Sequence, residues 1–155
     1  MQHLDPQAAH DFLHNDPQAV LVDCRTEIEH MYVGHPAGAE HVAWQEGPDW
    51  EVDPQFAAKV ARVVKGDLTR PVLLICRSGN RSVDAGVALE AAGFTQVINV
   101  LEGFEGPLDD DYHRGTQGGC RFRGLPWYHT SSLMEAGGAA VDAHHAGHVE
   151  RQCQG

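Results

Sequence analysis

The residues best suited to chemistry lie in the run Cys76-Arg77-Ser78-Gly79-Asn80-Arg81-Ser82. A cysteine is nucleophilic as its thiolate, which nearby positive charge stabilises. Backbone N–H groups of a tight loop can converge on an anion, and Arg77 and Arg81 add positive charge beside them. We therefore predict a nucleophilic Cys76 that faces the loop within reach of solvent. The alternative is a buried thiol that ends a core strand, the usual fate of a free cysteine, but the adjacent arginines and glycine favour the nucleophile.

The elements that flank this loop would place it at the edge of a sheet. Val72-Leu73-Leu74-Ile75 is apolar throughout and predicts a buried strand. A helix is expected to begin near Ser82, because alanines follow and Gly93 is a typical helix stop. Open α/β sheets bind their ligands at the carboxyl ends of the strands. The order of strand, loop and helix therefore predicts a binding site at that edge.

The spacing within the loop narrows the chemistry. Four residues separate Cys76 from Arg81, one fewer than in the comparable loop of protein tyrosine phosphatases. A loop this small lacks room for the oxygens of a phosphate but suits a terminal sulfur atom. It resembles the active-site loop of rhodaneses, sulfurtransferases that carry sulfur as a cysteine persulfide. The resemblance implies that Cys76 is catalytic and that the substrate is bound by Arg77, Ser78, Gly79, Asn80, Arg81 and Ser82.

Earlier residues strengthen the resemblance. Rhodanese domains carry a strand that ends in Asp-x-Arg, then a glutamate, then a Gly-His-x-x-Gly-Ala element. The matching residues are Asp23, Arg25, either Glu27 or Glu29, and the run Gly34-His35-Pro36-Ala37-Gly38-Ala39, in which Pro36 replaces the usual isoleucine. The family resemblance implies that Asp23, Arg25 and His35 give structural support as buried polar groups. A general-base role for His35 is the less favoured alternative.

Strands alternate with helices along the first two thirds of the chain. Helices are expected from Asp5 to about His14, near Glu27 to Tyr32, and from Asp53 to Lys65, and strands at Val20–Asp23, His41–Trp44 and Gln96–Val100. This alternation predicts a parallel sheet with helices on both faces. The resemblance implies the three-layer α/β fold of rhodaneses, with a mostly parallel central sheet. In the turn after Val100, Gly103 and Phe104 either shape the pocket or form a simple turn.

The length of 155 residues suits one domain. We expect a single rhodanese-like domain over residues 1–130, with its core at about 5–108 and a turn-rich extension at 109–130. Residues 131–155 are rich in Gly, Ala and His and predict a flexible tail. His144 and His148 have a spacing that could put two metal ligands on one helix face, but nearby glycines disfavour a helix. We expect no metal and no cofactor.

Composition excludes several partners. The formal charge of −11 argues against binding to nucleic acid or to an anionic membrane. No apolar run is long enough to span a bilayer, and the N-terminus lacks the basic and apolar regions of a signal peptide. The four cysteines are widely scattered, as expected for free thiols in a reducing cytoplasm.

The expected function is sulfur transfer through a Cys76 persulfide. The partners would be a small donor such as thiosulfate and a thiol or cyanide acceptor, or a protein in either role. An alternative with the same loop is a persulfide carrier or regulatory module that acts with a protein partner. Phosphatase or arsenate reductase activity is disfavoured by the loop spacing. Whether Cys24 forms a disulfide with Cys76 is left open by the sequence.

Overall fold

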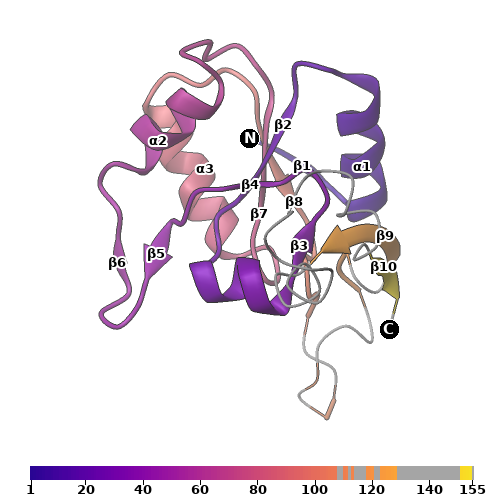
Figure 1. The fold of residues 1–155 in the computed structure, drawn as a ribbon. Helices are drawn as coiled ribbons and strands as arrows, with labels where there is room; N and C mark the ends of the chain where they lie inside the picture. The colour runs from indigo at the N-terminus through magenta and orange to yellow at the C-terminus, as the bar shows by residue number, and fades with distance from the viewer. Residues whose placement is uncertain (108–109, 112, 114–117, 121–122, 129–150, 155) are drawn as a thin grey trace, which may run out of the picture.

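A computed structural model describes residues 1–107, 110–111, 113, 118–120, 123–128 and 151–154. Its centre is a five-stranded sheet in the order β1-β8-β7-β2-β4, and every neighbouring pair is parallel (Figure 1). The strands are β1 (Gln2–Leu4), β2 (Val20–Asp23), β4 (Glu40–His41), β7 (Val72–Ile75) and β8 (Val97–Val100). This confirms the predicted parallel sheet and puts the strand before Cys76 at its middle.

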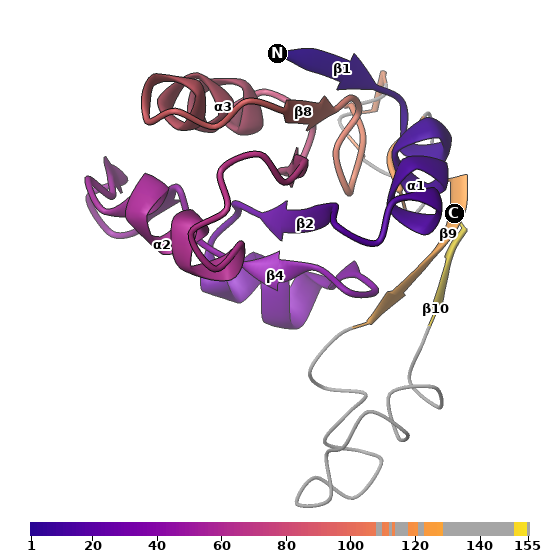
Figure 2. The same ribbon diagram turned by 90° about the horizontal axis from the view of Figure 1, so that it is seen from above.

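Helices cover both faces of the sheet, as expected. Helices α2 (Phe56–Val63) and α3 (Arg81–Ala91) lie on one side, and α1 (Pro6–Asn15) lies on the other (Figure 2). Alternate residues of β7 serve the two faces, since Leu74 packs in the cluster with α2 and α3 while Leu73 packs in the cluster with α1. A strand covered on both faces must be apolar throughout, which explains the run from Val72 to Ile75.

Local signals set the start of α1. The side chain of Asp5 accepts a hydrogen bond from the N–H of Ala8 at 2.8 Å, and Pro6 occupies the first helical position. Both features favour a helix start because the first turn leaves N–H groups without partners.

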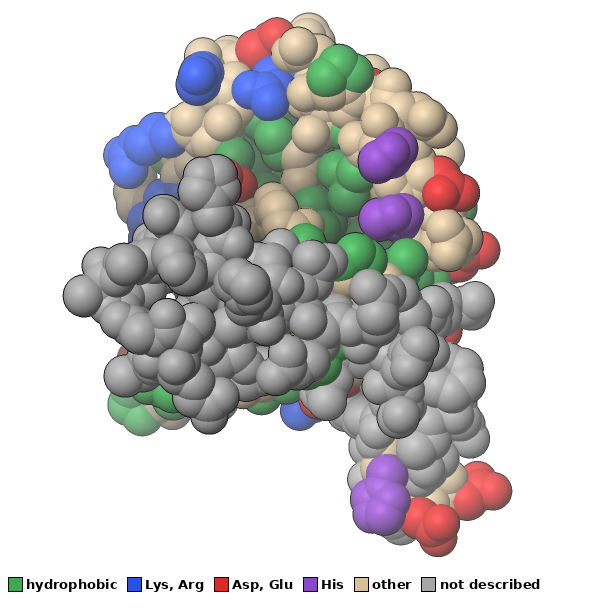
Figure 3. All heavy atoms as spheres, turned by 45° about the vertical axis from the view of Figure 1, so that its right-hand side comes forward, with side chains coloured by type: hydrophobic (Ala, Val, Ile, Leu, Met, Phe, Trp, Pro, Cys, Tyr) green, Lys and Arg blue, Asp and Glu red, His purple; other side chains and the backbone are tan. Residues whose placement is uncertain are grey.

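A small pocket of ≈ 70 Å³ lies between α1 and the segment around Pro126, and hydrophobic atoms are visible on this side of the molecule (Figure 3). It is far smaller than typical ligand sites.

Several short elements differ from the predicted ones. The strand β1 was not predicted, because it is short, largely exposed and held by the edge of β8. The helix expected near Glu27 to Tyr32 includes a π-helix, η1 (Glu29–Val33), and the strand expected at His41–Trp44 is β4. An unpredicted hairpin of β5 (Gln45–Glu46) and β6 (Glu51–Val52) precedes α2.

A second, antiparallel sheet has the order β10-β9-β3. Its strands are β3 (His35–Pro36), β9 (Arg123–Tyr128) and β10 (Arg151–Gln154). Residues 151–154 thus form a strand where a flexible tail was expected, because β9 offers them an edge of unpaired backbone groups. Residues 131–150, with His144 and His148, lie outside the described residues. Within the described parts of the chain, no helix is long and apolar enough to cross a membrane.

Candidate active site

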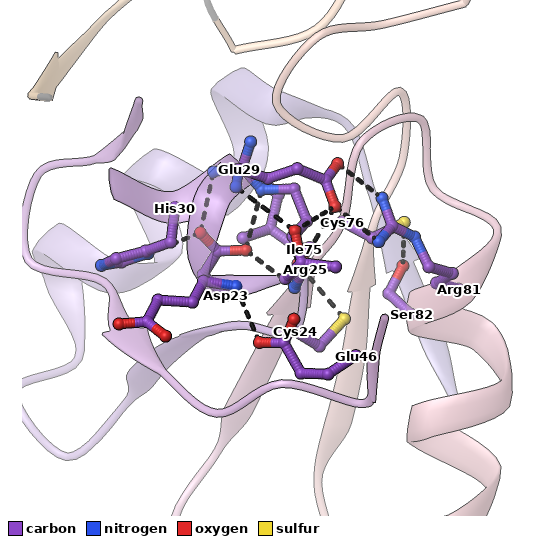
Figure 4. A network of polar contacts seen from close by, with 12 residues as sticks. Asp23, Cys24, Arg25, Glu29, His30, Glu46, Ile75, Cys76, Arg81 and Ser82 are labelled. Atoms are coloured by element: carbon purple, nitrogen blue, oxygen red, sulfur yellow. Dashed lines mark hydrogen bonds and ion pairs between the residues drawn. The ribbon is translucent and has the colours of Figure 1, made fainter. Parts of the chain in front are cut away.

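Cys76 follows the central strand β7, and its sulfur faces the loop that comes after it. The N–H of Gly79 donates to Cys76 Sγ at 3.1 Å. Ser82 Oγ lies 3.3 Å from the same sulfur (Figure 4). Gly79 has a φ of +100°, which L side chains rarely adopt, and a Cβ there would meet the N atom of Glu102 at 3.3 Å. Glycine is therefore what lets the loop turn its N–H back onto the sulfur.

The sulfur is enclosed, contrary to the expected access to solvent. Cys76 is 1% exposed and packs in the core cluster on the side of α2 and α3. An open cleft of ≈ 580 Å³ lies close by, and Cys76 is not among its lining residues, which are Thr26, Ile28, Glu29, Val33, Trp50, Arg77, Arg81 and Glu105. A molecule in this cleft therefore cannot reach the sulfur unless part of this wall moves.

Arg81 and Glu29 form part of that wall. The two terminal nitrogens of Arg81 donate to the two carboxylate oxygens of Glu29, each at 2.8 Å (Figure 4). Burial alone would raise the pKa of Glu29, but the hydrogen bonds and charge of Arg81 lower it below its usual value. Glu29, rather than the exposed Glu27, is therefore the glutamate that meets the loop. The substrate-binding role of Arg81 stays a prediction, because both terminal nitrogens are already paired.

Asp23 and Arg25 form a fully buried ion pair beneath the site. Arg25 donates through Nε and Nη2 to the two oxygens of Asp23 at 2.9 and 2.8 Å, and Nη2 also donates to the carbonyl of Gly34. Burial would raise the pKa of Asp23, but the charge of Arg25 and hydrogen bonds from His30 and Arg25 lower it far below the usual range. The Arg25 guanidinium also lies over the Phe104 ring, 4.7 Å from its centre.

Three histidines stack beside this pair. The rings of His30 and His35 are 3.8 Å apart, and the His41 ring is 4.7 Å from that of His30. His30 Nδ1 contacts Asp23 at 2.7 Å, while His35 Nδ1 donates to the carbonyl of His30 at 2.6 Å. Burial lowers the pKa of His35 to about 4. These contacts suit the structural role predicted for His35 better than a general-base role.

A comparison with known families identifies the fold. The family model for the rhodanese-like domain matches residues 5–108, the same span that the sequence motifs cover. The chain belongs to the rhodanese-like domain family. The resemblance drawn from the sequence is thus confirmed, and sulfur transfer is the activity type that the family supports.

Known proteins similar to this rhodanese-like chain include a solved structure of high similarity. The crystal structure of Rv0390 from M. tuberculosis has 39% sequence identity and a TM-score of 0.72, and the match covers 82% of this chain and 96% of that one. The polysulfide-sulfur transferase homodimer of Wolinella succinogenes has 25% identity and a TM-score of 0.52, over 66% and 69% of the two chains. The thiosulfate sulfurtransferase GlpE of Ectopseudomonas mendocina is 28% identical over 102 residues, 66% of this chain and 80% of that protein.

The turn after β8 packs tightly on the Cys76 loop of this rhodanese-like domain. Gly103 has a φ of +63°, and a Cβ there would meet Cys76 O at 2.4 Å and Ser78 N at 2.7 Å. The N–H of Phe104 donates to Cys76 O at 2.8 Å. The turn therefore shapes the site, which decides between the two interpretations that the sequence allowed.

The remaining cysteines and tryptophans differ in their surroundings. Cys24, Cys76 and Cys120 are free thiols in the described part of the chain. Cys24 donates to Ile75 O at 3.3 Å, and burial raises its pKa well above the usual value. Trp44 packs edge-on against Phe56, whereas Trp50 is 54% exposed and lines the cleft. Cys24 is therefore held as a thiol, and Trp50 belongs to the mouth of the site.

Two polar partners of the Cys76 loop, Asn99 and His3, were not predicted from the sequence. Asn99 lies inside β8 and accepts a hydrogen bond from Ser82, and His3 in β1 contacts the other end of the same amide. A polar residue within the buried run Val97-Ile98-Asn99-Val100 was the available signal, since buried polar groups need partners. In the described residues, no His, Cys, Asp or Glu cluster is arranged to hold a metal ion.

Proposed function

We propose that this protein is a sulfurtransferase that moves a sulfane sulfur through a Cys76 persulfide. The observation that carries the proposal is the hydrogen bond of 3.1 Å from Gly79 N–H to Cys76 Sγ, at the carboxyl end of the central strand. It aims a backbone donor at the sulfur, where it stabilises negative charge. Family membership and the similarity to named sulfurtransferases support the same activity type.

The reaction has two half-reactions. With thiosulfate as donor, the Cys76 thiolate attacks the outer sulfur, the S–S bond of the donor breaks, and sulfite leaves with the bonding electron pair. Cys76 then carries one extra sulfur as a persulfide. A thiolate or cyanide attacks that outer sulfur and takes it away as a persulfide or thiocyanate, which restores the Cys76 thiolate. Covalent catalysis of this kind gives ping-pong kinetics.

The basic residues of the loop would admit and orient the donor. Arg77 is exposed at the cleft and offers the first positive charge to an anion. The forked edge of Arg81 that faces Glu29 becomes available to an anion when the two hydrogen bonds between these side chains break. We propose that an anionic donor replaces the carboxylate of Glu29 on Arg81 and so opens a path to Cys76. A guanidinium is suited to this exchange because it binds carboxylates and oxyanions in the same forked geometry.

The direct test is the mass of the protein after treatment with thiosulfate. Wild type should gain about 32 Da, the mass of one sulfur atom held as a reversible persulfide. Cys76→Ser should gain nothing and should lose thiosulfate:cyanide activity, while the control Cys120→Ser, another buried thiol, should keep both. Full activity in Cys76→Ser, or no sulfur gain in wild type with any donor, would contradict the proposal.

A second candidate is a persulfide carrier that is loaded by a protein partner. The observation in its favour is the enclosed sulfur beside exposed apolar side chains, since Ile28 is 68% and Trp50 54% exposed at the cleft. A partner protein could bury these side chains and move the wall. Fast loading from a cysteine desulfurase with negligible turnover of thiosulfate would favour the carrier. Rapid turnover of thiosulfate alone would favour the enzyme.

A further inference from the structure

A chain of polar side chains links the Cys76 sulfur to the molecular surface. Ser82 Oγ lies 3.3 Å from Cys76 Sγ and donates its proton to Asn99 Oδ1 at 2.5 Å. Asn99 Nδ2 in turn donates to His3 Nδ1 at 3.2 Å. Ser82 and Asn99 are buried, whereas His3 is exposed on β1. The chain of hydrogen bonds therefore reaches a solvent-exposed imidazole.

The direction of these hydrogen bonds suits a thiol. A hydroxyl group has one proton to donate, and Ser82 gives it to Asn99. Only lone pairs of Ser82 Oγ then face the sulfur, so the contact with Cys76 is favourable when the S–H group donates. A thiolate in the same place would meet the lone pairs of Ser82 Oγ, so Ser82 would not stabilise it as the Gly79 N–H does. Sulfur transfer needs the Cys76 thiolate, and this thiolate is stabilised by Ser82 only if the hydroxyl donates to the sulfur instead of to Asn99.

The same atoms can form a reversed chain. If the Ser82 hydroxyl turns toward the sulfur, a half-turn of the Asn99 amide brings Nδ2 to Ser82 and Oδ1 to His3. His3 must then carry a proton on Nδ1, as one neutral tautomer and the cation both do. The reversal also gives up a contact of 3.5 Å from Asn99 Nδ2 to Gly79 O, which is at the limit of a hydrogen bond.

We propose that Asn99 and His3 are positioning residues that let this chain reverse when Cys76 ionises. The inference rests on the proposed function, because it concerns how the nucleophile forms. The thiol proton leaves to water when the wall of Arg81 and Glu29 beside Cys76 opens, and no proton crosses the amide; only the donor in each hydrogen bond changes. Among the charged groups nearby, Arg81 binds Glu29 and the Met1 ammonium group binds Glu90 of α3 at 3.0 Å. Arg77 adjoins Cys76 and is exposed at the cleft.

Two substitutions of Asn99 test the direction of the chain. In Asn99→Asp both carboxylate oxygens accept hydrogen bonds, so the Ser82 hydroxyl keeps donating to residue 99 and not to the sulfur. We expect the fraction of Cys76 present as thiolate to fall about tenfold, which is the effect of losing one hydrogen bond to a charged atom. In Asn99→Leu the hydroxyl is free to turn to the sulfur, so the thiolate fraction should not fall. The Cys76 thiolate is measured by its ultraviolet absorbance as a function of pH. For each variant, the absorbance of the same protein with the additional substitution Cys76→Ser is subtracted. Asn15→Asp, on the exposed end of α1, is the control.

A double-mutant cycle separates the hydrogen bond from the new charge. When Asn99→Asp is combined with Ser82→Ala, the introduced carboxylate remains but the hydroxyl is gone, so the loss of thiolate should be several times smaller. An equal loss with and without Ser82→Ala, or an equal loss in Asn99→Leu, would overturn the proposal.

Substitutions of the exposed His3 provide a test that leaves the core intact. His3→Gln can donate or accept and should keep the wild-type thiolate fraction, while His3→Leu should lower it severalfold, and His14→Gln is the control. Identical titrations of His3→Leu and wild type would show that His3 has no part in the chain of hydrogen bonds. These titrations are independent of sulfur loading, so a wild type that gains no mass from any sulfur donor would refute only the proposed function.

Discussion

Arg81 and Glu29, which are 52 positions apart in the sequence, meet through two hydrogen bonds of 2.8 Å between the Cys76 loop and η1. Their side chains are only 22% and 17% exposed. A forked pair of this kind is directional as well as strong. It holds the loop closed over Cys76 and also occupies the guanidinium that an anionic donor would use.

Removal of Arg81 should therefore destabilise the protein. Arg81→Ala leaves the Glu29 carboxylate largely buried without its partner, and we expect a loss of about 2 kcal/mol, between the values for surface and buried pairs. Urea unfolding at neutral pH measures this. The double variant Arg81→Ala with Glu29→Gln should recover part of the loss, and a double variant no more stable than Arg81→Ala would show that the pair is not the cause.

Gly103 should tolerate no side chain. Gly103→Ala places a Cβ 2.4 Å from Cys76 O at a φ of +63°, so the turn and the Cys76 loop must separate. Gly66 is the matched control, because its φ is +80° and no atom lies within 4 Å of an added Cβ. We expect Gly66→Ala to cost about 1 kcal/mol for backbone strain alone, and Gly103→Ala to cost clearly more and to impair sulfur loading. Equal losses of stability would argue against the close approach.

Stability should fall as the solution becomes mildly acidic. The pKa of His35 is lowered to about 4 in the folded protein, whereas the unfolded chain takes up that proton near pH 6.5. Between these values the unfolded state binds more protons, so the free energy of unfolding rises with pH and is lost as the pH falls. His35→Gln should flatten this dependence between about pH 6.5 and 4. An unchanged slope in urea unfolding across that range would show that His35 is not responsible.

The Asp23–Arg25 pair should contribute to the free energy of unfolding down to a lower pH than His35 does. Because the folded-state pKa of Asp23 is far below its usual value, its contribution is present above the unfolded pKa and is lost as acid protonates the carboxylate. Asp23→Asn leaves the Arg25 charge buried and should cost about 3–5 kcal/mol at neutral pH. Measurement is again by denaturant unfolding, with the exposed Asp11→Asn as control. A loss below about 1 kcal/mol, as for a surface pair, would contradict the buried pairing.

Trp50 should distinguish protein donors from small ones. Its side chain is exposed at the cleft, so Trp50→Ala should change the free energy of unfolding by less than about 0.5 kcal/mol. We expect unchanged loading from thiosulfate and slower loading from a persulfide-bearing protein, measured by intact mass over time. Trp44→Ala, which removes a core contact with Phe56, should instead reduce stability. Equal slowing with both donors would exclude a specific role for Trp50 in docking.

The sequence by itself determined the local elements and the identity of the loop. The capped start of α1, the apolar strand β7 and the loop from Cys76 to Ser82 all depend on residues that are close together in the chain. Such features follow from backbone propensity, capping and apolar periodicity, which act over a few residues. The same local patterns predicted the alternation that gives a parallel sheet.

Only the tertiary structure decided how distant side chains meet. It selected Glu29 over Glu27, enclosed Cys76, and joined Asn99 to His3 across 96 positions of sequence. These contacts follow from the strand order and the register, in which β1 pairs with β8 so that His3 lies opposite Asn99. The physical reason is that register depends on packing of the whole sheet, where a shift of one residue would turn each side chain to the other face.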